Sequence, residues 1–222
     1  MIHGEESWHR KLIEHRSALM AVVVTVGIAI GSVIEIVPMY TVAAGPDMSD
    51  TIEPYTPLEL AGRDIYIREG CYNCHSQMIR PFRAETLRYG DWSRAGEVAW
   101  DRPFQLGSRR IGPDLARIGG KYPDAWHYEH MKDPRATTPG SVMPPYPWLL
   151  EDKITAEDVA ATVQAHATLG APYDDTSVAG VQKSIDDQAG EIVKSLSGSK
   201  ITADKDDEIV ALIAYLQKLG AS

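Results

Sequence analysis

The hydrophobic residues of this chain form one long N-terminal run, followed by several shorter periodic segments. Between residues 18 and 37 the only ionisable side chain is that of Glu35. At about 1.5 Å per residue, a helix of this length spans the roughly 30 Å hydrocarbon core of a bilayer. The pattern predicts a polar N-terminus at 1–17, a transmembrane anchor at 18–44, a linker at 45–57 and an exported domain at 58–222.

Charge on either side of the apolar run predicts its orientation. Arg10, Lys11 and Arg16 precede the run, and Asp47 and Asp50 follow it. The positive-inside rule places the N-terminus in the cytoplasm and the rest of the chain outside. In a bacterial cell this is a single-pass protein of the inner membrane with a periplasmic domain.

A cleavable signal peptide is the alternative to a retained anchor. Residues 42–44 (VAA) would serve as a small-residue cleavage site. The apolar run is longer than the roughly 7–15 residues of a typical signal core, which favours the anchor. Glu35, near the outer end of the run, either contacts another membrane subunit or lies in the interfacial water layer.

Beyond the linker the periodicity is helical, and no run of alternating residues predicts strands. Thr56 and Glu59 have the spacing of a capping box for a helix that starts at Pro57 and continues to Gly70. Further helices are expected at 124–132, from the cap Thr155 to about 170, at 181–196 and at 202–220. The pattern therefore predicts an all-α domain.

The last of these helices has one apolar face. That face consists of Ile209, Leu212, Ile213, Leu216 and Leu219. Acidic residues in its first turn and a glycine after its last turn are typical helix signals. We expect this helix to cross the helix that begins at Pro57 and to contribute core rather than cofactor contacts.

The chemistry of the chain is concentrated in Cys71, Cys74 and His75, the only C-x-x-C-H motif. Two thiols at this spacing can form thioethers with the two vinyl groups of one porphyrin, and the adjacent imidazole can ligate its iron. A zinc site would need further ligands, and the chain has only 2 cysteines. A redox dithiol is normally set in a βαβ context, which the helical pattern does not offer. The motif predicts one covalently bound haem c.

A low-spin haem needs a second axial ligand, and Met143 is the best candidate. Two prolines follow it and favour a rigid, extended loop that can hold a side chain over a porphyrin. Met78 lies too near His75 to cross the ring, and Met131 falls in an expected helix, so both fit the role of core gap-fillers better. His127 and His130 are the competing ligands.

Pro113 is the candidate partner of His75. A metal-bound imidazole usually donates its second N–H to an acceptor that fixes the ring. The carbonyl group of Pro113, in a turn of sequence GPDL, can be that acceptor.

Residues 76–110 are rich in arginine and aromatic side chains. Such composition can indicate nucleic-acid binding, but a net charge of -9 and export across a membrane exclude nucleic acid as a partner. The arginines can instead bind haem propionates or an acidic protein surface. The simplest interpretation of any single arginine is a solvated charge balanced by nearby carboxylates, namely Glu85, Asp91, Glu97 and Asp101.

These motifs together resemble known cytochromes. The C-x-x-C-H motif, the GPDL turn, the loop at Met143 and the C-terminal helix resemble a class I cytochrome c, an all-helical fold around one haem. Residues 69–83 (EGCYNCHSQMIRPFR), with 88–90, 107–110 and 139–146, are similar to the membrane-anchored mono-haem subunit of cbb3-type cytochrome c oxidases. The likeness extends from the anchor to the C-terminal helix, and residues 97–106 are its least typical part.

The resemblance implies a role in aerobic respiration. Such a subunit passes electrons from a di-haem cytochrome c subunit or a soluble cytochrome c towards the large haem-copper subunit that reduces oxygen. It implies that Cys71 and Cys74 tether the haem, that His75 and Met143 ligate iron, and that this chain has no catalytic site. Two alternatives remain: the cytochrome c subunit of a membrane nitric oxide reductase, and an independent membrane-tethered carrier or haem sensor.

Overall fold

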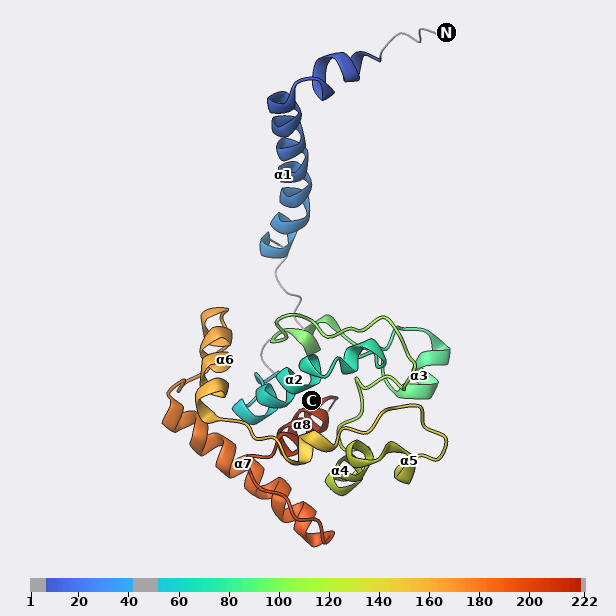
Figure 1. Cartoon of the computed structure of the whole chain (residues 1–222), viewed down its shortest axis with the longest axis vertical. Helices are drawn as coiled ribbons and strands as arrows, with labels where there is room; N and C mark the ends of the chain where they lie inside the picture. The colour runs from blue at the N-terminus through green and yellow to red at the C-terminus, as the bar shows by residue number, and fades with distance from the viewer. Residues whose placement is uncertain (1–6, 42–51, 221–222) are drawn as a thin grey trace. The chain divides into compact units, whose positions relative to one another are not determined.

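The computed structural model describes residues 7–41 and 52–220, and the chain divides into two compact units, Met1–Asp47 and Met48–Ser222. The first unit contains a short π-helix, η1 (Arg10–Glu14), and the long helix α1 (Ser17–Thr41) (Figure 1). Helix α1 is long and apolar enough to cross a membrane, with a mean hydropathy of 2.4 over its most apolar window. Its described side chains, including Glu35, are all exposed within the unit. An apolar helix with no packed face is suited to lipid rather than to water.

Two expectations about the region after α1 lie outside the described residues. These are the cleavage site at 42–44 and most of the linker at 45–57. The second unit is described from residue 52 onwards.

The second unit begins with α2 (Pro57–Arg68), which has the predicted capping box. The Thr56 side chain accepts a hydrogen bond from Glu59 N at 3.2 Å, and the Glu59 carboxylate accepts one from Thr56 N at 2.9 Å. Pro57 occupies the first turn, where its missing N–H leaves no bond unmade. This local signal places the C-terminal end of α2 directly before Cys71.

The described residues of this unit contain helices and turns but no β-strand, as the all-α prediction requires. After α2 come η2 (Cys71–Asn73), α3 (Arg83–Tyr89), η3 (Ala95–Val98), α4 (Asp124–Lys132), α5 (Pro134–Thr137), η4 (Pro147–Leu150), α6 (Ala156–Thr168), α7 (Val178–Gly198) and α8 (Glu208–Lys218). Helix α4 has the predicted bounds, and α6 is capped by Thr155 as predicted. Helix α7 extends the expected 181–196 segment at both ends.

Helix α8 differs from the prediction in two ways. It begins at Glu208 rather than near residue 202, because Asp204, Asp206 and Asp207 form an acidic turn around the ammonium group of Lys153. Its side chains from Glu208 to Leu216 are also buried on every face rather than along one stripe. The reason is that α2, α4 and α7 all pack against it, so it forms the centre of the domain (Figure 1).

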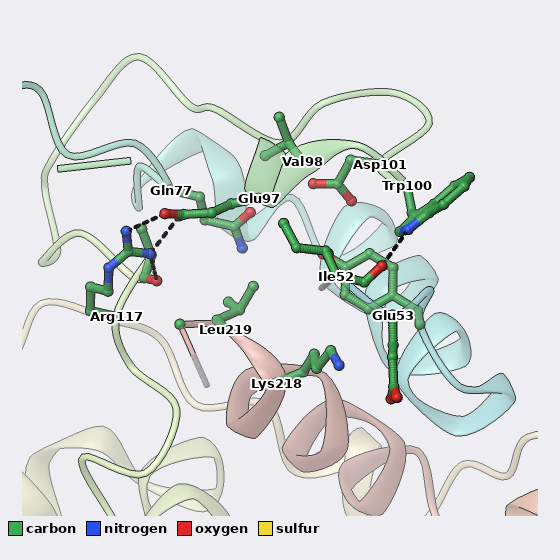
Figure 2. Close-up of a pocket in the computed structure, with 13 residues that line it drawn as sticks. Ile52, Glu53, Gln77, Glu97, Val98, Trp100, Asp101, Arg117, Lys218 and Leu219 are labelled. Carbon is green, nitrogen blue, oxygen red and sulfur yellow. Dashed lines mark hydrogen bonds and ion pairs between the residues drawn. The ribbon is translucent and has the colours of Figure 1, made fainter. Parts of the chain in front are cut away.

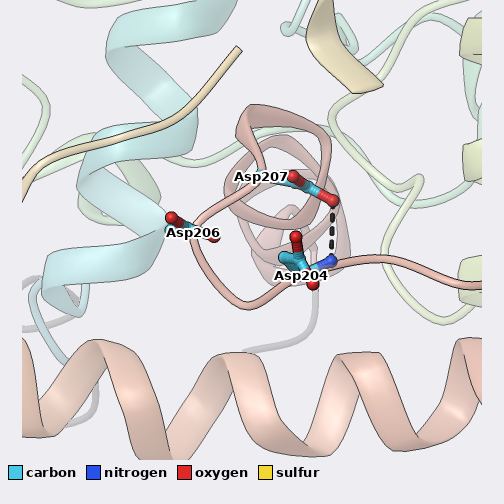
Figure 3. A group of neighbouring side chains, drawn as sticks. All are labelled: Asp204, Asp206 and Asp207. Atoms are coloured by element: carbon cyan, nitrogen blue, oxygen red, sulfur yellow. Dashed lines mark hydrogen bonds between the residues drawn. The ribbon is translucent and has the colours of Figure 1, made fainter. Parts of the chain in front are cut away.

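The acidic turn before α8 is shown in Figure 3. Lys153 Nζ lies 2.8 Å from Asp204 Oδ2, 3.0 Å from Asp206 Oδ1 and 2.7 Å from Asp207 Oδ1. These carboxylates raise the pKa of Lys153 by hydrogen bonding. The lysine supplies the positive charge that a metal ion would otherwise bring, so the cluster serves to join the segment before α6 to the start of α8.

Candidate haem site

The C-x-x-C-H motif follows α2 through a tight turn. Gly70 adopts the left-handed conformation with φ of 69°, which a residue with a side chain rarely does, and it redirects the chain into the 3-10 turn η2. Within that turn His75 N and Cys74 N donate to Cys71 O at 2.9 and 3.1 Å. The turn therefore holds both thiols and the imidazole on one compact piece of backbone.

The two thiols are free and differ in exposure. Neither forms a disulfide; Cys71 is half-buried against the core and Cys74 is exposed. Burial raises the pKa of the Cys71 thiol to about 12. A reactive redox thiol depends on a lowered pKa, so Cys71 is poorly suited to thiol–disulfide exchange. Both thiols remain available for thioether bonds.

His75 is oriented by Pro113. Its Nδ1 atom lies 2.8 Å from the carbonyl oxygen of Pro113. A carbonyl can only accept, so Nδ1 carries the proton and donates. Burial lowers the pKa of His75, which favours the neutral ring. The lone pair of Nε2 is therefore left for a metal, the arrangement expected of an imidazole ligand.

Gly112 allows the Pro113 turn to approach this ring. A Cβ at position 112 would lie 2.2 Å from Cε1 and 2.7 Å from Nδ1 of His75, closer than real contacts allow. The turn is also fixed by backbone hydrogen bonds on both sides of the histidine, from Gly112 N to Cys74 O at 3.0 Å and from Leu115 N to Ser76 O at 2.8 Å. The absence of a side chain at Gly112 is thus a condition for the His75–Pro113 hydrogen bond.

The loop carrying Met143 is brought to the same part of the domain. Met143 and Tyr146 are half-buried and pack against the core cluster that Cys71 also contacts. Tyr146 N donates to Met131 O at 2.8 Å, which ties the loop to the end of α4. Burial raises the pKa of Tyr146 to about 12, with the nearby Cys71 and Cys74 adding to the effect. The loop thus lies beside the cysteine motif.

The competing histidines on α4 have other surroundings. His127 is 1% exposed, and the rings of Tyr122 and Trp126 meet it edge-on at 6.3 and 5.3 Å. Burial lowers the pKa of His127 to about 4, so it is neutral. His130 stacks on Trp126, and its Nδ1 lies 2.5 Å from Thr137 Oγ1. His127 is therefore enclosed by protein atoms, and one nitrogen of His130 is already engaged.

Met78 and Met131, which were both expected to fill gaps in the core, differ in exposure. Met131 is 8% exposed and belongs to the core, as expected. Met78 is 38% exposed, so its assignment as a core gap-filler was wrong. The backbone at Met78 is held by Asp114 and Arg110, which leaves its side chain on the surface.

Of the four carboxylates expected to balance the arginines of this segment, two are buried. Asp101 is 3% exposed and forms a buried ion pair with Arg63, with Arg63 Nε to Asp101 Oδ1 at 2.8 Å. Glu85 is 8% exposed and accepts from Arg80 and Arg110. Sequence reasoning missed Arg63 because its distant partner leaves no local signal.

Two cavities of the described domain lack either the volume or the donor atoms for a haem. Figure 2 shows one of about 60 Å³, lined by Gln77, Arg117 and Leu219 among others. This volume is far too small for a porphyrin. A groove of about 310 Å³ between α2 and α6 is lined by charged residues such as Arg68 and Lys153, without cysteine, histidine or methionine. The donor set for a haem is found only at the motif among the residues described.

Over residues 9–222 the chain matches the family described as cytochrome C oxidase, mono-heme subunit/FixO. This chain belongs to the FixO family. A comparison with curated proteins finds no match. The FixO family is one of subunits of cytochrome c oxidase, an electron-transporting oxidoreductase complex, and its members carry a single haem. One haem per chain agrees with the single motif at Cys71.

The residues of the C-x-x-C-H motif are suited to binding one haem. Free thiols at Cys71 and Cys74 suit thioether attachment, and His75 offers Nε2 while Pro113 holds Nδ1. The close approach permitted by Gly112 gives the ring one orientation. A membrane anchor, α1, agrees with membership of a membrane oxidase family.

Proposed function

We propose that this chain is the electron-transfer subunit of a cbb3-type haem-copper oxidase and carries one haem c through thioethers at Cys71 and Cys74. The observation that carries the proposal is the hydrogen bond from His75 Nδ1 to the Pro113 carbonyl, beside two free thiols. A zinc site would need further ligands beyond the 2 cysteines and this imidazole, and a redox dithiol does not need an imidazole whose Nε2 is left for a metal. Membership of the FixO family supports the oxidase as the setting.

Each site residue has a separate task in this proposal. Thioethers at Cys71 and Cys74 would hold the porphyrin, and His75 Nε2 and the Met143 sulfur would ligate its iron. A thioether ligand favours the reduced iron and raises its potential. When bound, the haem supplies one-electron exchange between ferrous and ferric iron. The protein supplies orientation and electrostatics, and oxygen reduction takes place in another subunit.

The proposed partners follow from this role. Electrons arrive from a di-haem cytochrome c subunit or a soluble cytochrome c and leave towards the large haem-copper subunit. The basic flank of α1, with Arg10, Lys11 and Arg16, supports a cytoplasmic N-terminus and a periplasmic domain at the bacterial inner membrane. The same orientation delivers Cys71 and Cys74 to an oxidising compartment, where a free thiol pair without a cofactor would be at risk.

The deciding experiment is isolation of the complex from native membranes in mild detergent. The partners are identified by mass, and the reduced absorption spectrum and oxygen uptake are recorded. The proposal expects a c-type haem together with b-type haems, copper and oxygen uptake. A c-type haem on a chain that purifies alone would make it an independent carrier. A large subunit with non-haem iron in place of copper would point to a nitric oxide reductase.

Glu35 gives a second, separate proposal about assembly. It is an exposed carboxylate on an otherwise apolar segment of α1, where facing lipid would be unfavourable. We infer that Glu35 contacts a partner membrane subunit. Glu35→Gln should then lower the yield of intact complex without changing haem attachment. Unchanged assembly and turnover would show instead that Glu35 lies in the interfacial water layer.

A further inference from the structure

The residue after Pro113, Asp114, has a buried carboxylate. The side chain of Asp114 has no exposed surface. Its Oδ2 accepts from the Ser76 hydroxyl at 2.5 Å and from Met78 N at 3.1 Å, and its Oδ1 accepts from Ala116 N at 2.8 Å. Asp114 therefore bonds both to its own turn and to the segment that follows His75.

Arg110 binds the same residues as Asp114 and forms one hydrogen-bond network with them. Its Nε donates to Ser76 Oγ at 2.8 Å, and its Nη2 donates to Met78 O at 2.9 Å. The same Nη2 lies 3.3 Å from Asp114 Oδ2 and 2.8 Å from Glu85 Oε2. Two carboxylates thus balance one guanidinium, and the Ser76 hydroxyl is held in one orientation because it accepts from Arg110 and donates to Asp114.

The network joins the two segments that form the His75–Pro113 hydrogen bond. Ser76 follows His75, and Asp114 follows Pro113. The backbone hydrogen bonds that flank the histidine fix the two segments side by side, and the Asp114 side chain adds two more bonds between them. The distance from His75 Nδ1 to the Pro113 carbonyl is therefore set by this network as well as by the backbone.

We propose that Asp114 and Arg110 are positioning residues that fix the length of the His75–Pro113 hydrogen bond and thereby set the reduction potential of the haem. The inference rests on the proposed function, in which His75 ligates the iron. A shorter Nδ1–H···O bond makes the imidazole a stronger donor. A stronger donor stabilises ferric iron, so the network holds the potential lower than it would be without it.

Replacing Arg110 distinguishes a positioning effect on the reduction potential from a purely electrostatic one. If Arg110 acted only through its charge, its removal would favour the more positive ferric site and lower the potential. If it acts by positioning, its removal loosens the Ser76–Asp114 link, weakens the His75 hydrogen bond and raises the potential. The two explanations predict opposite signs for the Arg110→Gln variant.

Arg80 provides the matched control. It bonds Glu85, as Arg110 does, with Arg80 Nε to Glu85 Oε1 at 2.6 Å, but it makes no hydrogen bond to Ser76 or Asp114 among the described residues. Arg80→Gln removes the same charge from the same network. The reduction potential of the Arg80→Gln variant should equal that of the wild type or be lower.

The experiment uses the full-length chain with its haem attached, in detergent, labelled with ¹⁵N-histidine. The reduction potential is measured by optical titration, and the His75 Nδ1–H resonance is recorded in the reduced, diamagnetic protein. Arg110→Gln and Asp114→Asn should raise the ratio of ferrous to ferric protein several-fold at a fixed ambient potential. Both should also shift the Nδ1–H signal upfield and speed its exchange with water, while Arg80→Gln leaves that signal in place.

The outcomes separate this inference from the proposed function. A lowered or unchanged potential in Arg110→Gln, with the Nδ1–H signal unmoved, would overturn the positioning role while the haem stays attached. Should that variant not fold, Ser76→Ala removes only the hydroxyl between Arg110 and Asp114 and should shift both readouts in the same direction; no shift overturns the inference. A wild-type chain without haem at Cys71 and Cys74 would overturn the proposed function together with this inference.

Discussion

Gly62 of α2 lies directly against the backbone of Ala211 in α8. A Cβ at position 62 would be 1.9 Å from the Ala211 carbonyl oxygen and 2.8 Å from the Cβ of Tyr215. One turn further along α2, the Tyr66 ring lies 5.4 Å from the Tyr215 ring, measured between centroids. The crossing of these two helices beside the cysteine motif therefore depends on a missing side chain.

Gly62→Ala should separate the two helices and destabilise the domain. The added methyl group meets backbone atoms that no rotamer change can move, so we expect a loss of about 1–3 kcal/mol or more. Chemical denaturation of the purified chain measures it. Gly190→Ala in α7 is the control, because its Cβ would meet only the flexible Lys205 side chain, at 3.4 Å. That control should gain about 0.4–1 kcal/mol from the smaller entropy of the unfolded chain. Equal effects of the two substitutions would disprove the close-approach argument.

Met143→Ala should remove the second axial ligand while the haem stays covalently attached. The ferric protein should lose its sulfur-to-iron charge-transfer band, and its potential should fall because a thioether favours ferrous iron. Met78→Ala is the matched control, since that side chain is 38% exposed and should leave the spectrum unchanged. An unaltered band in Met143→Ala would rule Met143 out and make His130 the next residue to replace.

The buried pair of Arg63 and Asp101 should be sensitive to the loss of one partner. Asp101→Asn leaves an unpaired guanidinium that is 1% exposed, at an expected cost of about 3–5 kcal/mol in unfolding free energy. The double variant Arg63→Met with Asp101→Leu should be less destabilised, because no charge is left unpaired. As a control, Glu129→Gln breaks an exposed pair with Lys132 and should change stability by about 1 kcal/mol or less. A double variant less stable than Asp101→Asn would contradict this account.

Glu85 should make stability depend on pH. Hydrogen bonds from Arg110 and Arg80 lower its pKa from 4.5 to about 2 in the folded domain. A carboxyl group with a lowered folded pKa stabilises the fold above its unfolded pKa, and the effect is lost as pH falls through the folded pKa. The difference in unfolding free energy between wild type and Glu85→Gln should thus be constant from pH 7 to about 5 and narrow towards pH 2. A gap that widens on acidification would contradict the pairing.

The helices could be predicted largely from the sequence because their signals are local. The capping box at Thr56 and Glu59, the cap Thr155 and the bounds of α4 each depend on residues within a few positions of one another. Where a helix end depended on a distant partner, the prediction was wrong. The start of α8 is displaced to Glu208 because Lys153, more than fifty residues earlier, binds the acidic turn.

Only part of the candidate site could be predicted from the sequence. The spacing of Cys71 and Cys74 is a local property, and so is the adjacency of His75. The role of Pro113 as its partner could be proposed from the chemistry of metal-bound imidazole, but Gly112, Asp114 and their contacts with the ring and the Ser76 hydroxyl could not. These contacts join segments almost forty residues apart, and no periodicity records them.

The sequence by itself determined the apolar N-terminal helix, the C-x-x-C-H motif with its thiol and imidazole groups, and the helical class of the domain, because each follows from composition and short spacing. Only the tertiary structure decided that α8 is buried on all sides and that Asp101 and Glu85 are enclosed rather than solvated. It also decided how closely the Pro113 turn approaches His75. The physical reason is that burial and close approach depend on which distant segments pack together, and that is settled by the sum of many contacts across the whole domain.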